Sequence, residues 1–374
     1  MGLIAHVEAR ALAPEVDRFR YTARSDEVFT TTTLVRVTDD EGTSGVGAYD
    51  SDTFGAWDLA PLETLRTIVP RLIGVETDDR DHVAAMLTED GTSPFPPAVR
   101  STIDVALWDL AARRSGRPLR HELRNQHEAS ALPSYASVPL LDDERAYLSS
   151  IADLVSAGFG AVKLHAWGDP ERDASLLRSV RASFPKLTVM HDAEGRYSRE
   201  GAALVARACA EEDVRWLEAP LPDADLDGYR SLRRAVPGVA VLAAGDTFWD
   251  PRLVADVMRD PPWSAVRFDV SFVGGPTASL GLFEVAAEAG LDVELISYGH
   301  TVIQAVNLQV ALAFGRTTFF EQPVPPEPFE HGVRNPIRTM HDGLVHATDE
   351  PGLGIDFDDE AVDEATIAFV TASA

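Results

Sequence analysis

Charged residues stand at the ends of several short apolar segments from about residue 133 onward. Residues 160–165, Gly-Ala-Val-Lys-Leu-His, end in Lys163 and His165, and residues 187–192, Leu-Thr-Val-Met-His-Asp, end in Asp192. Apolar segments of this length are typical of buried strands. A single charged residue at such an end most often begins a loop or caps a helix. A charged residue at nearly every end instead predicts a functional site. The other members are Glu194, Glu218, Asp246, Asp269, His300 and Glu321.

The acidic members of this set predict a metal ion. Carboxylates that converge repel one another unless a cation lies among them. Asp192, Glu218 and Asp246 offer oxygen atoms from three successive segments, and Cys209 is the chain's one cysteine, which excludes a Cys-based zinc site. Oxygen ligands suit Mg²⁺, with Mn²⁺ as a substitute. A zinc site that uses His191 is the weaker interpretation, because His191 precedes Asp192 and strand alternation directs it away.

The remaining charged residues flank the expected metal ligands. Lys163 and His165 are two residues apart on one strand, so their side chains share a face. Asp269 and His300 follow neighbouring segments, and we expect a carboxylate–imidazole pair that acts as a base; an ion pair that closes the rim is the structural alternative. Glu321 is expected to be a general acid, an electrophilic donor or a rim residue.

A regular period in the sequence predicts the elements that hold these residues. Eight apolar segments begin 25 to 27 residues apart, with helical patterns between them. This spacing is too long for hairpins and indicates parallel strands joined by helices, which as eight units close into a (β/α)₈ TIM-type barrel of the α/β class with its chemistry at the carboxyl ends of the strands. The segments begin at Tyr135, Gly160, Leu187, Val214, Val239, Ala265, Leu291 and Thr317.

The first part of the chain has a different pattern and predicts an α+β capping domain. Three strands are expected, followed by three helices. We therefore expect a capping domain in residues 1–130, the barrel in 131–340 and a tail in 341–374 that returns to the capping domain. The expected strands are 3–12, 30–37 and 44–49, and the expected helices are 55–74, 79–88 and 97–115.

Composition excludes several classes of protein. The formal net charge of −27 disfavours a nucleic-acid partner, and the absence of a long apolar stretch or a leader-like start predicts a soluble, cytoplasmic protein with no membrane partner. The chain has 31 arginines and only two lysines, Lys163 and Lys186. Because arginine serves almost everywhere else, Lys163 is expected to do something that arginine cannot.

Together these segments resemble the enolase superfamily, and within it the mandelate racemase subgroup. The resemblance covers essentially the whole chain, from the order of its domains to its individual motifs. Asp269, five residues before Gly274, stands where muconate-lactonizing and dipeptide-epimerase relatives carry a lysine, which argues against cycloisomerisation and dipeptide epimerisation. The motifs are the helix Ser101–Arg113, Val162-Lys-Leu-His, Val189-Met-His-Asp, Trp216-Leu-Glu-Ala-Pro, Ala244-Gly-Asp, Phe268-Asp-Val-Ser-Phe-Val-Gly-Gly and Tyr298-Gly-His.

The resemblance implies a role for each residue of the set. It implies a small anionic carboxylate as substrate, a metal-stabilised enediolate and a homo-oligomer. Three positions depart from the family pattern: Asp246 where glutamate is usual, Glu194 where asparagine is common, and His165 in place of the second lysine of a Lys-x-Lys motif. The implied roles are Mg²⁺ ligation for Asp192, Glu218 and Asp246, a base dyad for Asp269 and His300, and substrate carboxylate contacts for Lys163 and Glu321.

Two reactions fit this set of residues. Dehydration of an acid sugar to a 2-keto-3-deoxy acid needs one base and a metal, whereas racemisation or epimerisation needs bases on both faces of the substrate. A Schiff-base aldolase that uses Lys163 and a non-catalytic scaffold are the alternatives from other classes. Specificity is expected to come from the capping domain, through the turn 49–57 and a basic loop, residues 14–29, that carries Arg18, Arg20, Tyr21 and Arg24.

Overall fold

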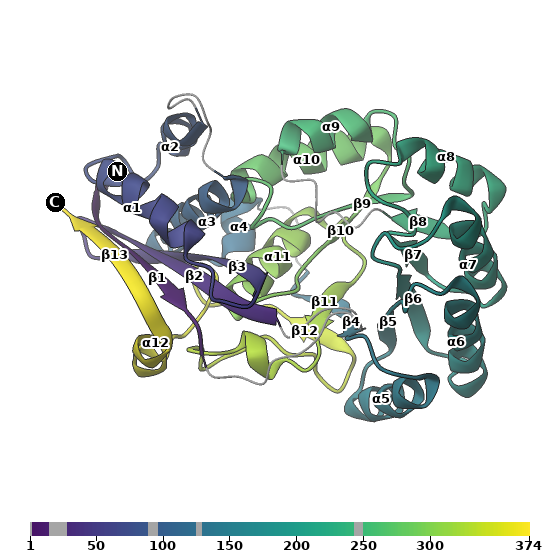
Figure 1. Cartoon of the computed structure of the whole chain (residues 1–374). Helices are drawn as coiled ribbons and strands as arrows, with labels where there is room; N and C mark the ends of the chain where they lie inside the picture. Colours follow the sequence, from purple (N-terminus) through teal and green to yellow (C-terminus); the bar gives the residue numbers. More distant parts are fainter. Residues whose placement is uncertain (1, 15–27, 89–95, 125–128, 243–249) are drawn as a thin grey trace.

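The structure of the chain is a parallel barrel with an antiparallel sheet domain beside it. The computed structural model describes residues 2–14, 28–88, 96–124, 129–242 and 250–374. Figure 1 shows helices α5 to α10 on the outside of the barrel strands, with the capping sheet and its helices α1 to α3 at the other end of the molecule. The predicted (β/α)₈ barrel with a capping domain is confirmed.

Eight parallel strands form the barrel in the order β11, β4, β5, β6, β7, β8, β9, β10. Each begins within four residues of its predicted position. The seam between β10 and β11 is joined by Ser297, whose hydroxyl donates to the Glu321 carbonyl (3.0 Å) and accepts from the Glu321 N–H (3.1 Å). The strands are β4 Ala131–Val138, β5 Ala161–His165, β6 Thr188–Asp192, β7 Trp216–Glu218, β8 Ala240–Leu242, β9 Ala265–Phe268, β10 Asp292–Leu295 and β11 Phe320–Pro323, and β12, Leu344–His346, pairs antiparallel with β4.

The barrel helices begin where the sequence supplies capping residues. Helices α5 to α9 each follow an Asp or Ser whose side chain accepts a hydrogen bond from a backbone N–H of the first turn. This N–H has no carbonyl partner within the helix, so the side chain provides the missing acceptor. The helices are α5 Glu144–Ala157, α6 Pro170–Ser183, α7 Arg199–Glu211, α8 Leu226–Ala235, α9 Pro251–Met258, α10 Gly275–Ala289 and α11 Thr301–Phe314, with a short 3₁₀ turn η1 at Glu327–Phe329.

The end of the chain completes the capping sheet, as expected. Strand β13 pairs antiparallel with β1, so the sheet order is β13, β1, β2, β3 (Figure 1). The helical tail before β13 and the helix α4 were not predicted as separate elements. The domain limits at 130 and 340 stay predictions. The capping elements are β1 Ile4–Leu12, β2 Val28–Asp39, β3 Ser44–Phe54, α1 Ala60–Leu72, α2 Arg80–Thr88, α3 Pro97–Ser115, α4 Leu119–Leu123, α12 Asp359–Ala365 and β13 Thr366–Ser373.

Two glycines let helix α3 pack directly on strand β3. A Cβ atom on Gly47 would lie 2.1 Å from the Thr102 carbonyl oxygen, and one on Gly45 would lie 2.2 Å from the Ala106 carbonyl oxygen. Any larger residue would force the helix away from the sheet. The alternation of glycine in the Ser-Gly-Val-Gly-Ala run therefore fixes the core of the capping domain, and with it the strand that reaches the barrel.

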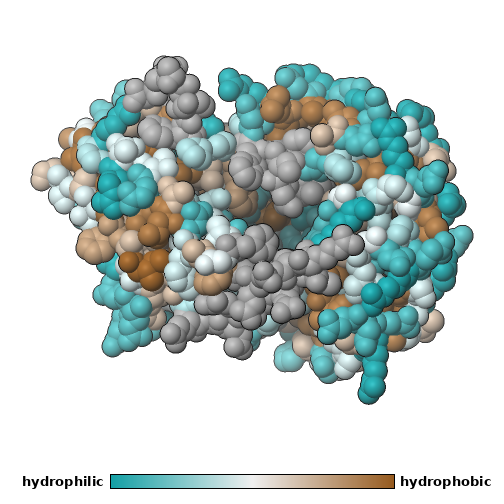
Figure 2. Space-filling view, viewed as in Figure 1, coloured by the Kyte–Doolittle hydropathy of each residue, from teal (hydrophilic) through white to brown (hydrophobic). Residues whose placement is uncertain are grey.

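The visible face of the molecule is largely polar. Figure 2 shows hydrophilic residues over most of the outer face of the barrel helices α6 to α8. This agrees with the excess of 60 Asp and Glu over 33 Lys and Arg, because charged side chains remain hydrated when they are exposed. Of the described helices, none combines the length and the hydropathy that a membrane crossing requires.

Asp104 on helix α3 joins the capping domain to the barrel. Its carboxylate accepts the Thr277 N–H (2.9 Å) and the Thr277 hydroxyl (2.6 Å) at the start of α10. Burial raises the pKa of Asp104 to about 6, although both Thr277 bonds oppose the shift. The ionised form is thus less favourable in the folded protein than in the unfolded chain.

We expect the substitution Asp104→Asn to change how stability depends on pH. Because the folded pKa lies above the unfolded value, ionised Asp104 destabilises the fold above pH 6, and this cost disappears as the pH falls towards 4. The unfolding free energy of the variant relative to wild type should therefore rise by up to about 3 kcal/mol from pH 4 to pH 7.5. Urea unfolding at both pH values measures it, and a difference independent of pH would contradict it.

Candidate active site

The sequence-predicted residues meet at the carboxyl ends of the barrel strands. A pocket of about 250 Å³ lies there, which is small for a ligand pocket and suits a small substrate. Five of the eight predicted catalytic and metal-ligating residues line it, as does Glu194. The lining residues are Asp52, Ser137, Lys163, His165, Asp192, Glu194, Glu218, Arg267, Phe272, Ile296, Tyr298 and Glu321.

Lys163 lies at the centre of the carboxylates. Its Nζ atom is 2.8 Å from Glu321 Oε1, 3.2 Å from Glu218 Oε1 and 3.4 Å from Asp192 Oδ2, and the residue is only 3% exposed. Burial alone would lower the pKa of Lys163, but Glu218 and Glu321 raise it well above its usual value. The ammonium group therefore stays charged, which argues against an aldolase that needs a neutral amine.

Arg267 is a second buried cation in the pocket, which the sequence analysis did not single out. Its Nε atom is 2.9 Å from Glu218 Oε1, and its Nη2 atom donates to Glu321 Oε2 at 3.1 Å. Burial would raise the pKa of Glu321, but Lys163 and Arg267 reverse this and hold it well below its usual range. Glu321 is therefore an ionised carboxylate and an acceptor here, which disfavours its expected alternative as a proton donor.

Asp192 and Glu218 are suited to act as two of the ligands of a hard divalent cation. They are paired in register at the ends of adjacent strands β6 and β7, and both supply carboxylate oxygens. Burial raises the pKa of Glu218 to about 8, with Asp192 and Glu321 adding to the shift and Arg267 and Lys163 opposing it. Asp246, the predicted third ligand, lies outside the described residues, and among those described no three acidic, His or Cys residues form a complete metal-binding group.

His165 lies beside the carboxylates with one ring nitrogen directed to the pocket. Its Nδ1 atom is 2.6 Å from the Val138 carbonyl oxygen, to which it donates, and this bond leaves Nε2 as the unprotonated acceptor. Nε2 lies 3.7 Å from Asp192 Oδ2. Burial lowers the pKa of His165, so the imidazole is neutral at pH 7 and can accept a proton.

Asp269 and His300 are not among the residues that line the pocket. The His300 Nε2 atom donates to the His331 carbonyl (2.9 Å), and Nδ1 accepts the Val302 N–H (3.3 Å) as the cap of α11. Asp269 Oδ1 instead accepts from Ser271, and no hydrogen bond joins Asp269 to His300 in this structure. The expected bond between these two described residues is therefore absent, and their role as a base dyad stays a prediction.

His191 and Glu194 flank the metal candidate Asp192. His191 is fully buried and its Nε2 atom lies 2.9 Å from the Tyr197 hydroxyl, on the side away from the pocket, as strand alternation predicted. Glu194 adopts a positive φ of 49°, and its N–H donates to Asp192 Oδ1 at 2.9 Å. This bond orients the Asp192 carboxylate, while the Glu194 side chain is paired with Arg196.

The capping domain contributes to the pocket through strand β3. Asp52 is part of the lining, and Asp50 Oδ2 accepts the backbone N–H of His300 at 2.6 Å. The Tyr49 ring meets the lining residue Phe272 edge to face, with 5.3 Å between centroids. These contacts place the predicted turn 49–57 at the barrel mouth, whereas Arg18, Arg20, Tyr21 and Arg24 of the predicted basic loop lie outside the described residues.

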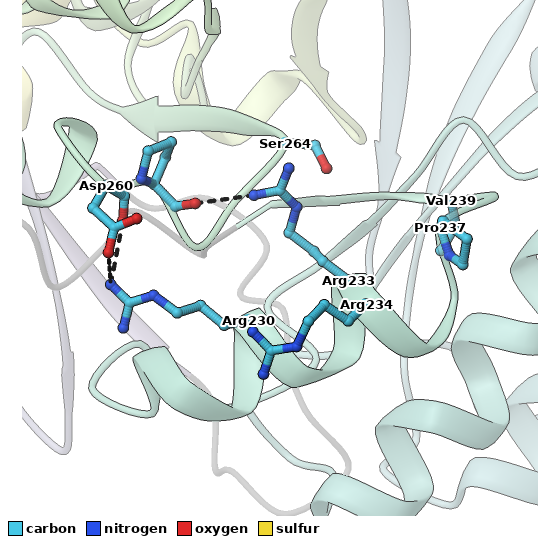
Figure 3. A pocket seen from close by; sticks show the side chains of 8 residues that line it. Arg230, Arg233, Arg234, Pro237, Val239, Asp260 and Ser264 are labelled. Atoms are coloured by element: carbon cyan, nitrogen blue, oxygen red, sulfur yellow. Dashed lines mark hydrogen bonds and ion pairs between the residues drawn. The ribbon is translucent and has the colours of Figure 1, made fainter.

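A second pocket of about 390 Å³ lies at the opposite end of the barrel strands. Figure 3 shows Arg230 of α8 directed to Asp260. Arg230 Nη2 donates to Asp260 Oδ2 at 2.9 Å, and Arg233 Nη1 donates to the Pro261 carbonyl at 2.9 Å. These bonds tie the segment before β9 to the end of α8. Because parallel barrels carry their chemistry at the carboxyl ends of the strands, we interpret this pocket as structural.

The fold and the site define a barrel enzyme with a carboxylate-lined mouth beneath a capping domain, and the comparisons agree. A family model described as "Enolase C-terminal domain-like" matches residues 146–361, and one described as "Mandelate racemase / muconate lactonizing enzyme, N-terminal domain" matches residues 8–123. The chain belongs to the mandelate racemase/muconate lactonizing enzyme family of the enolase superfamily, a superfamily of enzymes.

Characterised relatives carry out different reactions. The chain is 26% identical over 270 residues to the L-Lys-D/L-Arg epimerase of Methylococcus capsulatus, which covers 71% of this chain and 74% of that protein. It is 24% identical over 330 residues to the L-talarate/galactarate dehydratase of Salmonella typhimurium, which covers 86% of this chain and 79% of that protein. Membership of the family therefore does not by itself identify the reaction of this protein, because relatives of similar identity include an epimerase and a dehydratase.

Solved structures agree with the fold. A putative mandelate racemase/muconate lactonizing enzyme from Pseudovibrio sp. superposes with a TM-score of 0.95 and 33% identity over 100% of both chains. The L-talarate dehydratase of Polaromonas sp. JS666, complexed with Mg and L-glucarate, superposes with a TM-score of 0.86 and 21% identity over 100% of both chains. At 21% identity the second likeness is one of fold.

Proposed function

We propose that this protein is a Mg²⁺-dependent acid sugar dehydratase, which removes the α-proton of a small hydroxy carboxylate and eliminates water to give a 2-keto-3-deoxy acid. One observation carries the proposal. The pocket combines the buried carboxylates Asp192 and Glu218, a charged Lys163 and one histidine, His165, whose Nε2 is in its acceptor form. This is the set that removal of a weakly acidic proton requires.

The chain's own residues supply binding charge and a base. Removal of an α-proton places negative charge on the substrate carboxylate, and the Lys163 ammonium lies where it can stabilise that charge in a water-poor site. His165 Nε2 accepts the proton, and the carbonyl of Val138 holds the ring in the required tautomer. The departing β-hydroxyl then takes a proton and leaves as water. The proton is either the one that His165 has accepted or one from His300, the acid expected from the sequence, in which case His165 keeps the α-proton and His300 is reprotonated from solvent.

Asp192 and Glu218, with the sequence-predicted Asp246, are the residues that would hold the cation. When bound, Mg²⁺ supplies Lewis acidity toward the substrate carboxylate oxygens. The excess of carboxylates over cations in the described pocket supports this assignment. Glu194 N–H and Trp216 Nε1 hold the two ligands in place, because they donate to Asp192 Oδ1 (2.9 Å) and Glu218 Oε2 (3.2 Å).

Dehydration is favoured over racemisation by the number of bases in the pocket. Racemisation requires a proton acceptor on one face of the substrate and a proton donor on the other. Among the residues that the structure describes, His165 is the histidine that lines the pocket, while both nitrogens of His300 are bonded to backbone groups. One base is enough for elimination, and a hydroxyl at the β-carbon then becomes the leaving group.

Incubation with aldonic and aldaric acids in D₂O tests the proposed function. The purified protein with Mg²⁺ is expected to release a 2-keto-3-deoxy acid, detected with semicarbazide and by NMR. Deuterium at the α-carbon without release of a keto acid would show that the reaction is racemisation or epimerisation and not dehydration. Neither signal across a broad set of acids would overturn proton abstraction from sugar acids altogether.

The variant His165→Gln is expected to lose α-proton exchange and turnover by about 10²- to 10⁴-fold, because no other described pocket residue offers a neutral nitrogen base. His300→Gln is the matched comparison, measured by the same α-deuterium exchange and keto-acid release. Retained exchange with slowed elimination would assign His300 as the acid. Exchange lost in His300→Gln but retained in His165→Gln would transfer the base to His300 and contradict the prediction.

A further inference from the structure

We propose that Arg267 is a positioning residue that sets Glu218 and Glu321 in the orientation that cation and substrate require, an assignment that rests on the proposed function. Its guanidinium reaches three strands at once. Nε lies 2.9 Å from Glu218 Oε1 on β7, Nη2 donates to Glu321 Oε2 on β11 at 3.1 Å, and Nη1 donates to the Tyr135 hydroxyl on β4 at 3.3 Å. The residue is 1% exposed.

Arg267, Lys163 and Trp216 together contact all four oxygens of the two carboxylates. Glu321 has Lys163 at Oε1 and Arg267 at Oε2. Glu218 has both cations at Oε1, while Oε2 accepts from Trp216 Nε1 at 3.2 Å. Every oxygen of both groups therefore has a partner, so neither carboxylate is free to rotate within the barrel.

Only arginine provides this arrangement. Its planar group carries donors in a fixed fork and can meet two carboxylates on different strands, whereas an ammonium group is a point charge. Tyr135 fixes the third edge of the guanidinium, and the Tyr135 ring is itself held edge to face against Trp216, with centroids 5.6 Å apart. Arg267 is thus a buried part of the pocket lining rather than a mobile surface group.

Arg267 can affect cation binding in two ways: it orients the carboxylates, and its positive charge repels the cation. The two effects can be distinguished. A carboxylate oxygen that contacts one cationic group retains lone pairs for a metal ion, and loss of a group that orients a metal ligand typically weakens metal binding by about 10- to 100-fold. If charge repulsion between Arg267 and the cation dominated, removal of the arginine would tighten binding instead. The positioning role and the charge role thus predict opposite signs.

Calorimetric titration with MgCl₂ of the full-length wild type, Arg267→Met and Arg267→Lys tests the assignment. Both variants are expected to bind Mg²⁺ about 10- to 100-fold more weakly, because the lysine restores the charge without the fork. Arg120→Met is the matched control: Arg120 is a buried arginine that bonds to Thr348 outside the pocket, and its variant should keep wild-type Mg²⁺ affinity. Should Arg267→Met fail to fold, Arg267→Lys carries the test.

The outcomes separate this assignment from the proposed function. If Arg267→Met binds Mg²⁺ as tightly as the wild type or more tightly, the positioning role is overturned and the proposed function is not. The same holds if Arg267→Lys binds Mg²⁺ with wild-type affinity. Weaker binding in both variants together with no reaction on any acid supports the positioning role and overturns the proposed reaction. A wild type that binds no divalent cation overturns both.

Discussion

Substitution of Glu218 by glutamine is expected to abolish Mg²⁺ binding and to lower turnover by at least about a thousandfold. The amide keeps the shape of the side chain but removes the charge that a hard cation requires. It also presents an NH₂ group to a site where Lys163 and Trp216 donate to Glu218 and the Arg267 guanidinium is paired with it. Calorimetric MgCl₂ titration and keto-acid release measure the two effects.

The variant is expected to fold, because three carboxylates contact the two buried cations Lys163 and Arg267, and two of these carboxylates remain in the variant. Removing Glu218 leaves Asp192 and Glu321 to balance Lys163 and Arg267. Glu294→Gln is the matched control: Glu294 is a buried barrel glutamate outside the pocket lining, and its carboxylate accepts from Thr318. Retained Mg²⁺ affinity and turnover in Glu218→Gln would remove Glu218 from the list of ligands.

The barrel could be predicted because its signal is local and repeated. Eight apolar segments at a constant spacing leave parallel pairing as the arrangement that their connections permit, and each strand begins within four residues of its predicted position. The last strand, β13, was not predicted as a strand. Its residues 366–373 gain their structure by pairing with β1 at the other end of the chain, and no local pattern encodes a partner at that distance.

Strand alternation predicted some of the pocket residues correctly. The predicted set was incomplete because the rule was not applied to every strand. Alternation placed Lys163 and His165 on one face, and both line the pocket. Arg267 lies within the predicted segment that begins at Ala265, and alternation was not applied to it, although its side chain lines the pocket. By contrast, the bond from Asp50 to His300 joins residues 250 positions apart, and it depends on how the capping domain sits on the barrel.

Several expectations from the sequence remain predictions. Asp246 is the third expected metal ligand and falls in residues 243–249, outside the described part of the chain. The homo-oligomeric state and the cytoplasmic location rest on the resemblance and on composition. The catalytic roles of Asp269 and His300 depend on a contact that the described side chains do not make, and the His165 and His300 variants distinguish the two positions.

Substitution of Lys163 by arginine is expected to lower turnover by at least about a hundredfold although it preserves the charge. The Nζ atom of Lys163 meets three carboxylates within 3.4 Å in a site that is 3% exposed. A planar guanidinium is larger than an ammonium group and directs its donors along fixed axes. It is therefore not expected to contact Asp192, Glu218 and Glu321 at once, as the ammonium group does.

The composition of the chain makes this an informative substitution. With 31 arginines and two lysines, arginine is the residue that this sequence uses for a positive charge in general. Lys186→Arg, at the exposed second lysine, is the matched control and should leave turnover and stability unchanged. If Lys163→Arg also retained wild-type turnover, the compact shape of the ammonium group would be irrelevant, and Lys163 would act only as a charge that balances the carboxylates.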